Sequence, residues 1–397
     1  MHPPAHPVPL RLGALAVLAA TCALSSPAAA GLCSALPKPV YLAGSGTVTI
    51  GEIAKALGPS GLTLIYKPED SCLAVDQILN GTPLGPPADP TATYWDSSGM
   101  PQPCTLDPMG VNVDIGVSDV FATTCNMLPN GLPNDVRDHF GPAQAFVFVV
   151  PTQSTQKAIS KKAGYFAFGF GSASGVAPWT DTMSLVHRAP TSGTQLTMSI
   201  ALGIQPDRWQ GQTATSSGDL VTRMTMSTMP EATLGILTAE VAAANSATVR
   251  ALAYKDDEQT CAYYPDSTPT AHDKLNVRDG HYALWGPLHL FARVNTQGLA
   301  LSPDARTLIA YLDGTIDPPP GVDLLGLFTH ADLVPQCAMR VQRMNELGAL
   351  ASFAPQRACG CFFEQVATGA TTCHPCTSDA ACSKGAPRCN YGFCETQ

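Results

Sequence analysis

The chain has 397 residues, of which 45% are hydrophobic and 13% charged, so it is long and apolar enough for two lobes or two domains. Its net charge of −9 at pH 7 argues against nucleic acid as a partner. The 34 glycines and 35 prolines predict many turn-rich connections.

The first thirty residues have the pattern of a signal peptide. "MHPPAHPVPLR" is followed by the apolar run "LGALAVLAATCALSS" and then by Ala28 to Ala30, which offers a cleavage site. A lipoprotein anchored through Cys22 is an alternative, although Thr21 is a poor residue before a lipidated cysteine. No later run of ~18 uncharged apolar residues occurs, so the mature chain is expected to be exported, periplasmic or at the cell surface, without a transmembrane span.

The body alternates strand-like and helix-like segments. The spacing predicts strands over 39–44, 62–67 and 111–119, and helices over 49–58 and 72–81, which end on Gly and on Asn-Gly. This alternation predicts an α/β fold with mostly parallel sheets and flanking helices, in which ligands bind at the carboxyl ends of the strands.

Small polar residues follow the predicted strands at four places. Three are the segments 44–47, 70–71 and 118–119, and the fourth is Arg188 with the segment 192–194 in "RAPTSGTQ". Hydroxylated residues cap the N–H groups of a helix start, and a helix N-terminus beside a guanidinium favours an anion. Each junction alone is more often a structural cap, but their recurrence predicts a site for a small tetrahedral oxyanion.

The order of these motifs resembles that of the phosphate-binding proteins of bacterial ABC transporters, which have the type II periplasmic binding protein fold. The matching segments are "AGSGTVTIGEIAKAL", "YKPEDSCLAVDQILNG", "DIGVSD" and "WTDTMSLVHRAPTSGTQ", within roughly residues 38 to 315. The resemblance implies that a phosphate ion, or a similar small oxyanion, is captured between two lobes by hinge closure. An ABC permease is the protein partner that it implies.

The resemblance also implies the ligand contacts and the division of the chain. The contacts fall on Thr47, Val48, Ser71, Asp119, Arg188, Ser192, Gly193 and Thr194. The family's acidic residue two positions after the arginine is Pro190 here, which leaves the identity of the oxyanion open. Residues 1–30 are expected to be the signal peptide, 31–150 with 280–356 the first lobe, 151–279 the second lobe, and 357–397 a cysteine-rich tail.

The cysteines predict disulfides rather than a metal site, because the chain looks exported. Of the 14 cysteines, 13 remain once Cys22 is removed or lipidated, so one thiol is expected to be unpaired. The tail has little aliphatic periodicity and is expected to be held by disulfides. "CHPC" at 373–376 has the spacing of a redox motif, but the chain leaves no room after it for a βαβ unit, which favours a structural staple.

An enzyme is the less favoured class, and no catalytic residue, cofactor or metal is predicted. "STQK" at 154–157 matches the S-x-x-K of penicillin-interacting serine enzymes, but the sequence has neither a K-T-G nor an S-D-N partner for it, and no G-x-S-x-G occurs. A third class stays open: a surface or interaction protein that uses the binding fold as a scaffold and its disulfide-rich tail as a contact. A cleft filled by loops or bridged by disulfides would favour that class.

Overall fold

The structure is a computed structural model that describes residues 31–85, 88–125 and 131–396, with the backbone alone at 47 and 48. The predicted signal peptide and Cys22 lie outside these residues. No helix within the described ranges has the length and hydropathy that a membrane span requires.

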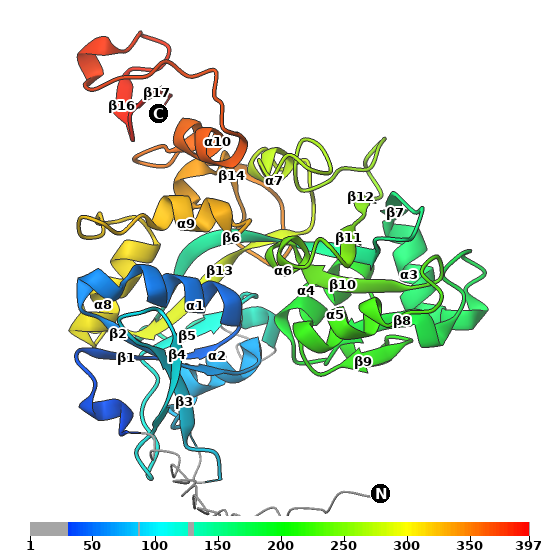
Figure 1. The fold of residues 1–397 in the computed structure, drawn as a ribbon, viewed down its shortest axis with the longest axis horizontal. Helices are drawn as coiled ribbons and strands as arrows, with labels where there is room; N and C mark the ends of the chain where they lie inside the picture. The colour runs from blue at the N-terminus through cyan, green and yellow to red at the C-terminus, as the bar shows by residue number, and fades with distance from the viewer. Residues whose placement is uncertain (1–30, 86–87, 126–130, 397) are drawn as a thin grey trace, which may run out of the picture. The chain divides into compact units, whose positions relative to one another are not determined.

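The first lobe is built on a five-stranded sheet with two added edge strands (Figure 1). Its order is β2-β1-β5-β13-β6, in which β1 pairs in parallel with β2 and β5, and β13 is antiparallel to both its neighbours. The antiparallel strands β3 and β4 extend the β2 edge. The bounds are β1 Pro39–Gly44, β2 Thr63–Pro68, β3 Thr91–Trp95, β4 Pro101–Thr105, β5 Ile115–Ser118, β6 Val136–Pro151 and β13 Trp285–Arg293.

The second lobe repeats this order with different segments. Its sheet runs β9-β8-β10-β6-β11, in which β8 is parallel to β9 and β10, and β6 is antiparallel to β10 and β11. Both sheets therefore place three parallel strands first and an antiparallel strand fourth, and β6 belongs to both. The bounds are β8 Leu185–Arg188, β9 Gln212–Ala214, β10 Leu234–Thr238 and β11 Val249–Ala251. The expected α/β fold class is confirmed, with parallel strands in the centre of each lobe and antiparallel pairing elsewhere.

Helices flank both sheets, as the alternation of the sequence predicts. Apolar side chains of α1, α8 and α9 fill one core with β1, β2 and β13, whereas α3, α4 and α5 pack around the second-lobe sheet. The bounds are α1 Thr47–Ala56, α2 Ser71–Asn80, α3 Lys161–Phe170, α4 Gly193–Leu202, α5 Ser217–Thr225, α6 Ala239–Ala244, α7 Leu275–Arg278, α8 Pro303–Leu312, α9 Leu324–His330 and α10 Gly360–Thr368. The remaining short strands are β7 Ala158–Ser160, β12 Ala253–Lys255, β14 Val341–Gln342, β15 Ala351–Ser352, β16 Arg388–Asn390 and β17 Phe393–Glu395.

The predicted strand over 111–119 is wrong in its first part. The regular strand is β5, and Val111 instead forms an isolated bridge with Leu84. Asp114 lies just before β5, where its carboxylate accepts the hydrogen bond of the Tyr41 backbone N–H at 2.9 Å in place of a backbone carbonyl. The segment before β5 is therefore an irregular connection packed on the edge of β1.

Six disulfides confirm the oxidised state predicted for the cysteines. Among the described residues they join Cys33–Cys104, Cys72–Cys125, Cys337–Cys359, Cys361–Cys373, Cys376–Cys389 and Cys382–Cys394. The single cysteine left over is Cys261, which is exposed. The two cysteines of "CHPC" therefore pair with other partners and not with each other.

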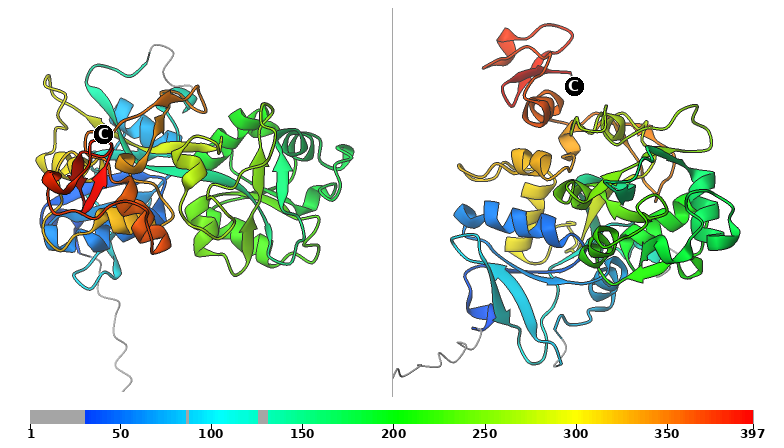
Figure 2. Two further views of the ribbon diagram at one scale, coloured as in Figure 1. Left: turned by 90° about the horizontal axis from the view of Figure 1, so that it is seen from above. Right: turned by 45° about the vertical axis from the view of Figure 1, so that its right-hand side comes forward.

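The C-terminal region divides at the end of α10. Phe363 of α10 is 1% exposed and belongs to the same apolar cluster as the second-lobe core, and Cys359 joins it there. The β16–β17 hairpin lies beyond α10 (Figure 2) and carries few buried side chains, Cys394 and Glu395 among them. The helix is thus fixed by apolar packing, while the hairpin depends on Cys376–Cys389 and Cys382–Cys394.

Candidate functional site

A cavity of about 630 Å³ lies between the two lobes, at the carboxyl ends of their parallel strands. Its first-lobe wall consists of the segments that follow β1, β2 and β5, namely 44–46, 68–70 and Asp119. Its second-lobe wall consists of Arg188 at the end of β8 and the segments 215–218 and 238–241 that follow β9 and β10. The cavity therefore occupies the place where the sequence predicts a ligand.

Four helices of nine or ten residues begin at this cavity. The residues that precede their first turns are Gly46 for α1, Asp70 for α2, Ser192 for α4 and Ser216 for α5, and all four line the cavity. The first N–H groups of a helix have no partner inside the helix, and together with the helix dipole they favour an anion. Ser216 caps its own helix at the N–H of Asp219, whereas Ser192 makes no such side-chain bond.

Arg188 supplies the positive side chain of the cavity. Its NH1 donates to Ser217 Oγ at 2.7 Å, and its backbone N–H donates to Gln195 Oε1 at 3.0 Å. Its Nε is buried and has no acceptor among the described residues. The backbone of Arg188 is thus held by α4 and its guanidinium by α5, and the buried Nε–H is left without an acceptor among the described residues.

Three carboxylates surround the charge of Arg188. Burial lowers the pKa of Arg188, and Asp119, Asp70 and Asp219 counteract this effect. The resemblance leads us to expect an acidic neighbour two positions after the arginine, where this chain has Pro190. Carboxylates from distant parts of the chain are its charged neighbours instead.

Asp119 is buried at the end of β5 and both its oxygens accept hydrogen bonds. Gln144 Nε2 donates to Oδ1 at 3.0 Å, and Ser45 Oγ donates to Oδ2 at 3.0 Å. Burial raises the pKa of this carboxyl, and these two bonds, Arg188 and His289 oppose the rise. Only 7% of the residue is exposed, so any ligand atom that reaches it is largely withdrawn from water.

The lobes touch each other directly behind this part of the cavity. Ser71 is fully buried, where its Oγ accepts from the Asp119 N–H at 3.1 Å and lies 2.9 Å from Ser45 Oγ. A Cβ on Gly193 would come within 2.5 Å of both Asp119 Cβ and Ser71 Oγ. The Thr191 hydroxyl also donates to the Asp70 carboxylate across the gap. The glycine of the predicted "SGT" motif is therefore needed for contact between the lobes.

The predicted contact residues fall into three groups. Asp119, Arg188, Ser192 and Thr194 line the cavity, and Ser71 and Gly193 lie directly behind Asp119. Thr47 and Val48 begin α1 at the cavity, but their side chains lie outside the described part of the structure. A role in binding stays a prediction for all eight residues.

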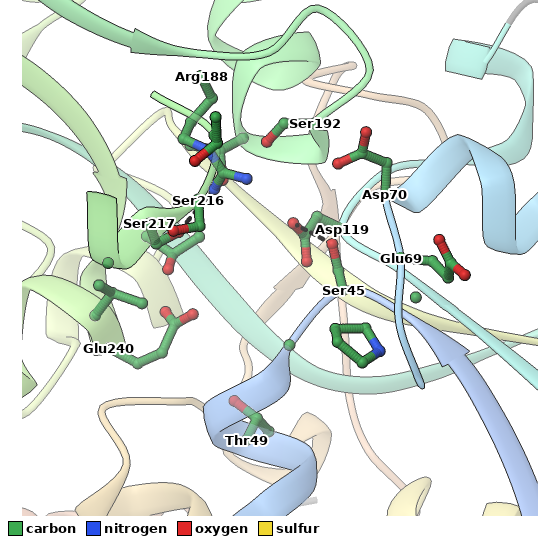
Figure 3. Close-up of a pocket in the computed structure, with 18 of the residues that line it drawn as sticks. Ser45, Thr49, Glu69, Asp70, Asp119, Arg188, Ser192, Ser216, Ser217 and Glu240 are labelled. Atoms are coloured by element: carbon green, nitrogen blue, oxygen red, sulfur yellow. Dashed lines mark hydrogen bonds between the residues drawn. The ribbon is translucent and has the colours of Figure 1, made fainter. Parts of the chain in front are cut away.

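Several lining residues are not among the predicted ligand contacts (Figure 3). They are Ser45, Thr49, Glu69, Asp70, Ser216, Ser217 and Glu240. The sequence does contain a signal for Ser216 and Ser217. They lie in "ATSSGDL", which places hydroxyl groups and a glycine after a strand as "APTSGTQL" does. Ser45 and Asp70 belong to segments that the sequence does mark as strand-to-helix junctions.

No protein-family model matches the chain, and no curated protein sequence matches it. Among solved structures, it is similar to an ABC-type phosphate transport receptor from Vibrio cholerae, with 12% identity, 74% of this chain and 99% of that chain covered, and a TM-score of 0.47. It is also similar to a putative phosphate ABC transporter substrate-binding protein with bound phosphate from Clostridium perfringens. The identity is 11%, the match covers 75% of this chain and 99% of that chain, and the TM-score is 0.46. The reduced OxyR regulatory domain from Pseudomonas aeruginosa is 9% identical to this chain. That match covers 70% of this chain and 97% of that chain, with a TM-score of 0.40. None of these likenesses establishes what this chain binds.

Proposed function

We propose that this protein is an exported solute-binding protein that captures a phosphate group, free or as part of a small solute, between its two lobes. The observation that carries the proposal is the convergence of four helix N-termini and Arg188 on one cavity. Fixed N–H groups and a guanidinium within each lobe are suited to recognise a tetrahedral oxyanion.

The donors for the oxyanion come mainly from the second lobe. Arg188 and Ser217 are already joined, and the Ser192 and Thr194 side chains, at 4% and 3% exposure, stand at the start of α4. Hydrogen bonds to a charged group in such a dry environment are stronger than those in water. Asp119 from the first lobe can accept a hydrogen bond from the hydroxyl group that phosphate still carries near neutral pH.

The ligand would bridge the two lobes. Strand β6 runs through both lobes, and a rotation about it would change the distance between Asp119 and Arg188. A ligand that satisfies donors and acceptors on both sides shifts the equilibrium toward the closed arrangement. Delivery of the captured solute to an ABC permease belongs to the same proposal, and the six disulfides suit an extracytoplasmic location.

Thermal unfolding in the presence of phosphate tests the proposal. A ligand at 100 times its Kd stabilises the folded state by about 2.7 kcal/mol, which raises the Tm by several degrees. Arg188→Ala is expected to abolish this rise and to leave the ligand-free Tm near that of the wild type. Arg208→Ala is the matched control, because its side chain is 79% exposed and lies outside the cavity.

Two results would contradict the proposal. One is a wild-type Tm that no phosphate compound raises, which would favour a surface or interaction protein built on this fold. The other is an equal rise in the wild type and in Arg188→Ala, which would place the bound phosphate elsewhere.

A further inference from the structure

The cavity is much larger than a phosphate ion. Its volume of about 630 Å³ falls within the range of sites for small organic ligands, roughly 300–1,000 Å³. One water molecule takes up ~30 Å³ in the liquid, so an ion of a few such volumes would fill a small part of the space. The remaining space has to be matched by the rest of the solute.

The charges around the cavity are mostly negative. Arg188 is the one cationic side chain among the described lining residues, whereas four carboxyl groups line it, those of Glu69, Asp70, Asp119 and Glu240. An isolated phosphate would add further negative charge to a wall that already has an excess of it. Like charges at short distance in a dry site repel each other strongly.

These carboxyl groups differ in their charged neighbours. Asp70 and Asp119 interact with Arg188, and Glu69 interacts with Lys67. The charged neighbours of Glu240 are Asp119 and Asp332, which are both carboxylates. The cavity therefore has one wall, at the start of α6, where a buried carboxyl group faces no cation.

Glu240 is built into this wall. It is 9% exposed and forms a side-chain hydrogen bond with Thr238, but its Oε2 is buried without a hydrogen-bond partner among the described residues. Figure 3 shows Ser216 and Ser217 between Glu240 and Arg188, so the two charged side chains stand apart on the second-lobe wall. An unpaired buried carboxylate is costly unless a donor or a cation meets it.

Resting on the proposed function, we infer that the solute is a zwitterion, a phosphate monoester or phosphonate that carries an ammonium group. The oxyanion lies against Arg188 and the helix N-termini, and the ammonium group lies against Glu240. An ammonium group has three donors and needs several acceptors. Asn245 also lines the cavity, and its amide nitrogen donates to the Val241 carbonyl at 2.8 Å, which leaves its oxygen as the acceptor.

The ionisation of Glu240 is consistent with this role. Burial raises the pKa of Glu240 from 4.5 to about 7, and the nearby carboxylates add to the effect. An ammonium group placed against it favours the charged form and lowers that pKa again. Binding of such a solute near pH 7 should therefore release protons from the protein.

Calorimetric titration with matched pairs of compounds tests the inference. The pairs are phosphoethanolamine against ethyl phosphate and aminopropyl phosphate against propyl phosphate, which differ in the ammonium group. In at least one of the two pairs, the wild type is expected to bind the amine at least tenfold more tightly than the compound that lacks the ammonium group. In Glu240→Gln the difference should fall below threefold, and ethyl phosphate should bind somewhat better because a carboxylate is gone. Glu258→Gln, an exposed carboxylate outside the cavity, should keep the wild-type difference.

The outcomes separate the inference from the proposed function. If ethyl phosphate and propyl phosphate both bind the wild type as tightly as their amines do, the inference is wrong and the proposed function stands. If no compound of either pair binds, and inorganic phosphate does not bind, both are wrong. Tenfold selectivity that persists in Glu240→Gln would overturn the assignment of the ammonium site to Glu240.

Discussion

Glu240→Gln should stabilise the protein at high pH and not at low pH. In the folded protein burial raises the pKa of Glu240 to about 7, whereas the ordinary value is 4.5. The folded state therefore holds this proton more tightly than the unfolded state does. Below pH 4.5 both states keep the proton and burial of the neutral acid adds no ionisation cost; as the pH rises through 7, the wild type loses stability.

The size of the effect follows from the same two values. A difference of one in pKa corresponds to about 1.4 kcal/mol, so the ionisation of Glu240 costs the folded protein about 3 kcal/mol at pH 8. Glutamine keeps the shape and carries no charge, and it avoids this cost at every pH. The free energy of unfolding of Glu240→Gln should thus exceed that of the wild type by up to about 3 kcal/mol at pH 8 and by little at pH 4.

Urea unfolding with intact disulfides, without phosphate and at a series of pH values, measures this difference. Other carboxyl groups with raised pKa values that do not interact with Glu240, among them Asp114 and Glu346, give both proteins a common pH dependence that cancels in the comparison. Glu258→Gln is the control and should follow the wild type throughout. A difference between Glu240→Gln and the wild type that is the same at pH 4 and pH 8 would refute the reasoning.

Three further predictions concern the contact between the lobes, the choice of anion and the C-terminal hairpin. Gly193→Ala should weaken phosphate binding at least ~10-fold, because the added Cβ would meet Asp119 and Ser71 and hold the lobes apart. Gly169→Ala on α3 is the control and should bind phosphate as the wild type does. Equal Kd values for Gly193→Ala and the wild type, measured by calorimetry, would count against this role of Gly193. The wild type should bind phosphate more tightly than sulfate by a factor on the order of 10⁴, since sulfate has no proton to donate to Asp119. Asp119→Asn should reduce this difference in affinity. Wild-type Kd values for phosphate and sulfate within tenfold of each other would show that Asp119 does not contact the ligand. Removing the disulfide Cys376–Cys389 with paired serines should expose the hairpin to hydrogen exchange and leave α10 protected; loss of protection in α10 would show that the hairpin supports the body.

The sequence predicts the fold well because its signals are local. Alternating strand and helix patterns separate β1, α1, β2 and α2, and glycine ends such as Gly81 close the helices. The hydroxyl-rich junctions are equally local, and the structure brings Asp119 and Arg188 to one cavity from segments far apart in the chain. A repeated pattern at the ends of parallel strands is therefore enough to predict where the cavity lies.

The remaining features depend on contacts between distant residues. Glu240 lies in "AEVAAA", a six-residue helix whose sequence does not distinguish it from an exposed surface helix. The role of Gly193 depends on Ser71 and Asp119, which belong to the other lobe. Disulfide connectivity is likewise out of reach, since eight cysteines allow on the order of a hundred pairings. Such features follow from the tertiary structure and leave no periodic signal.

Equilibrium dialysis with radiolabelled phosphate at pH 7 tests the central claim most directly, because it counts bound ions whatever their effect on stability. The wild type should retain one phosphate per chain in a saturable way, and unlabelled phosphate should displace it. Arg188→Ala should retain none at the same concentrations, while Arg208→Ala should match the wild type. A wild type that retains neither phosphate nor labelled phosphoethanolamine in the same assay, or an Arg188→Ala variant that retains as much phosphate as the wild type, would contradict the account.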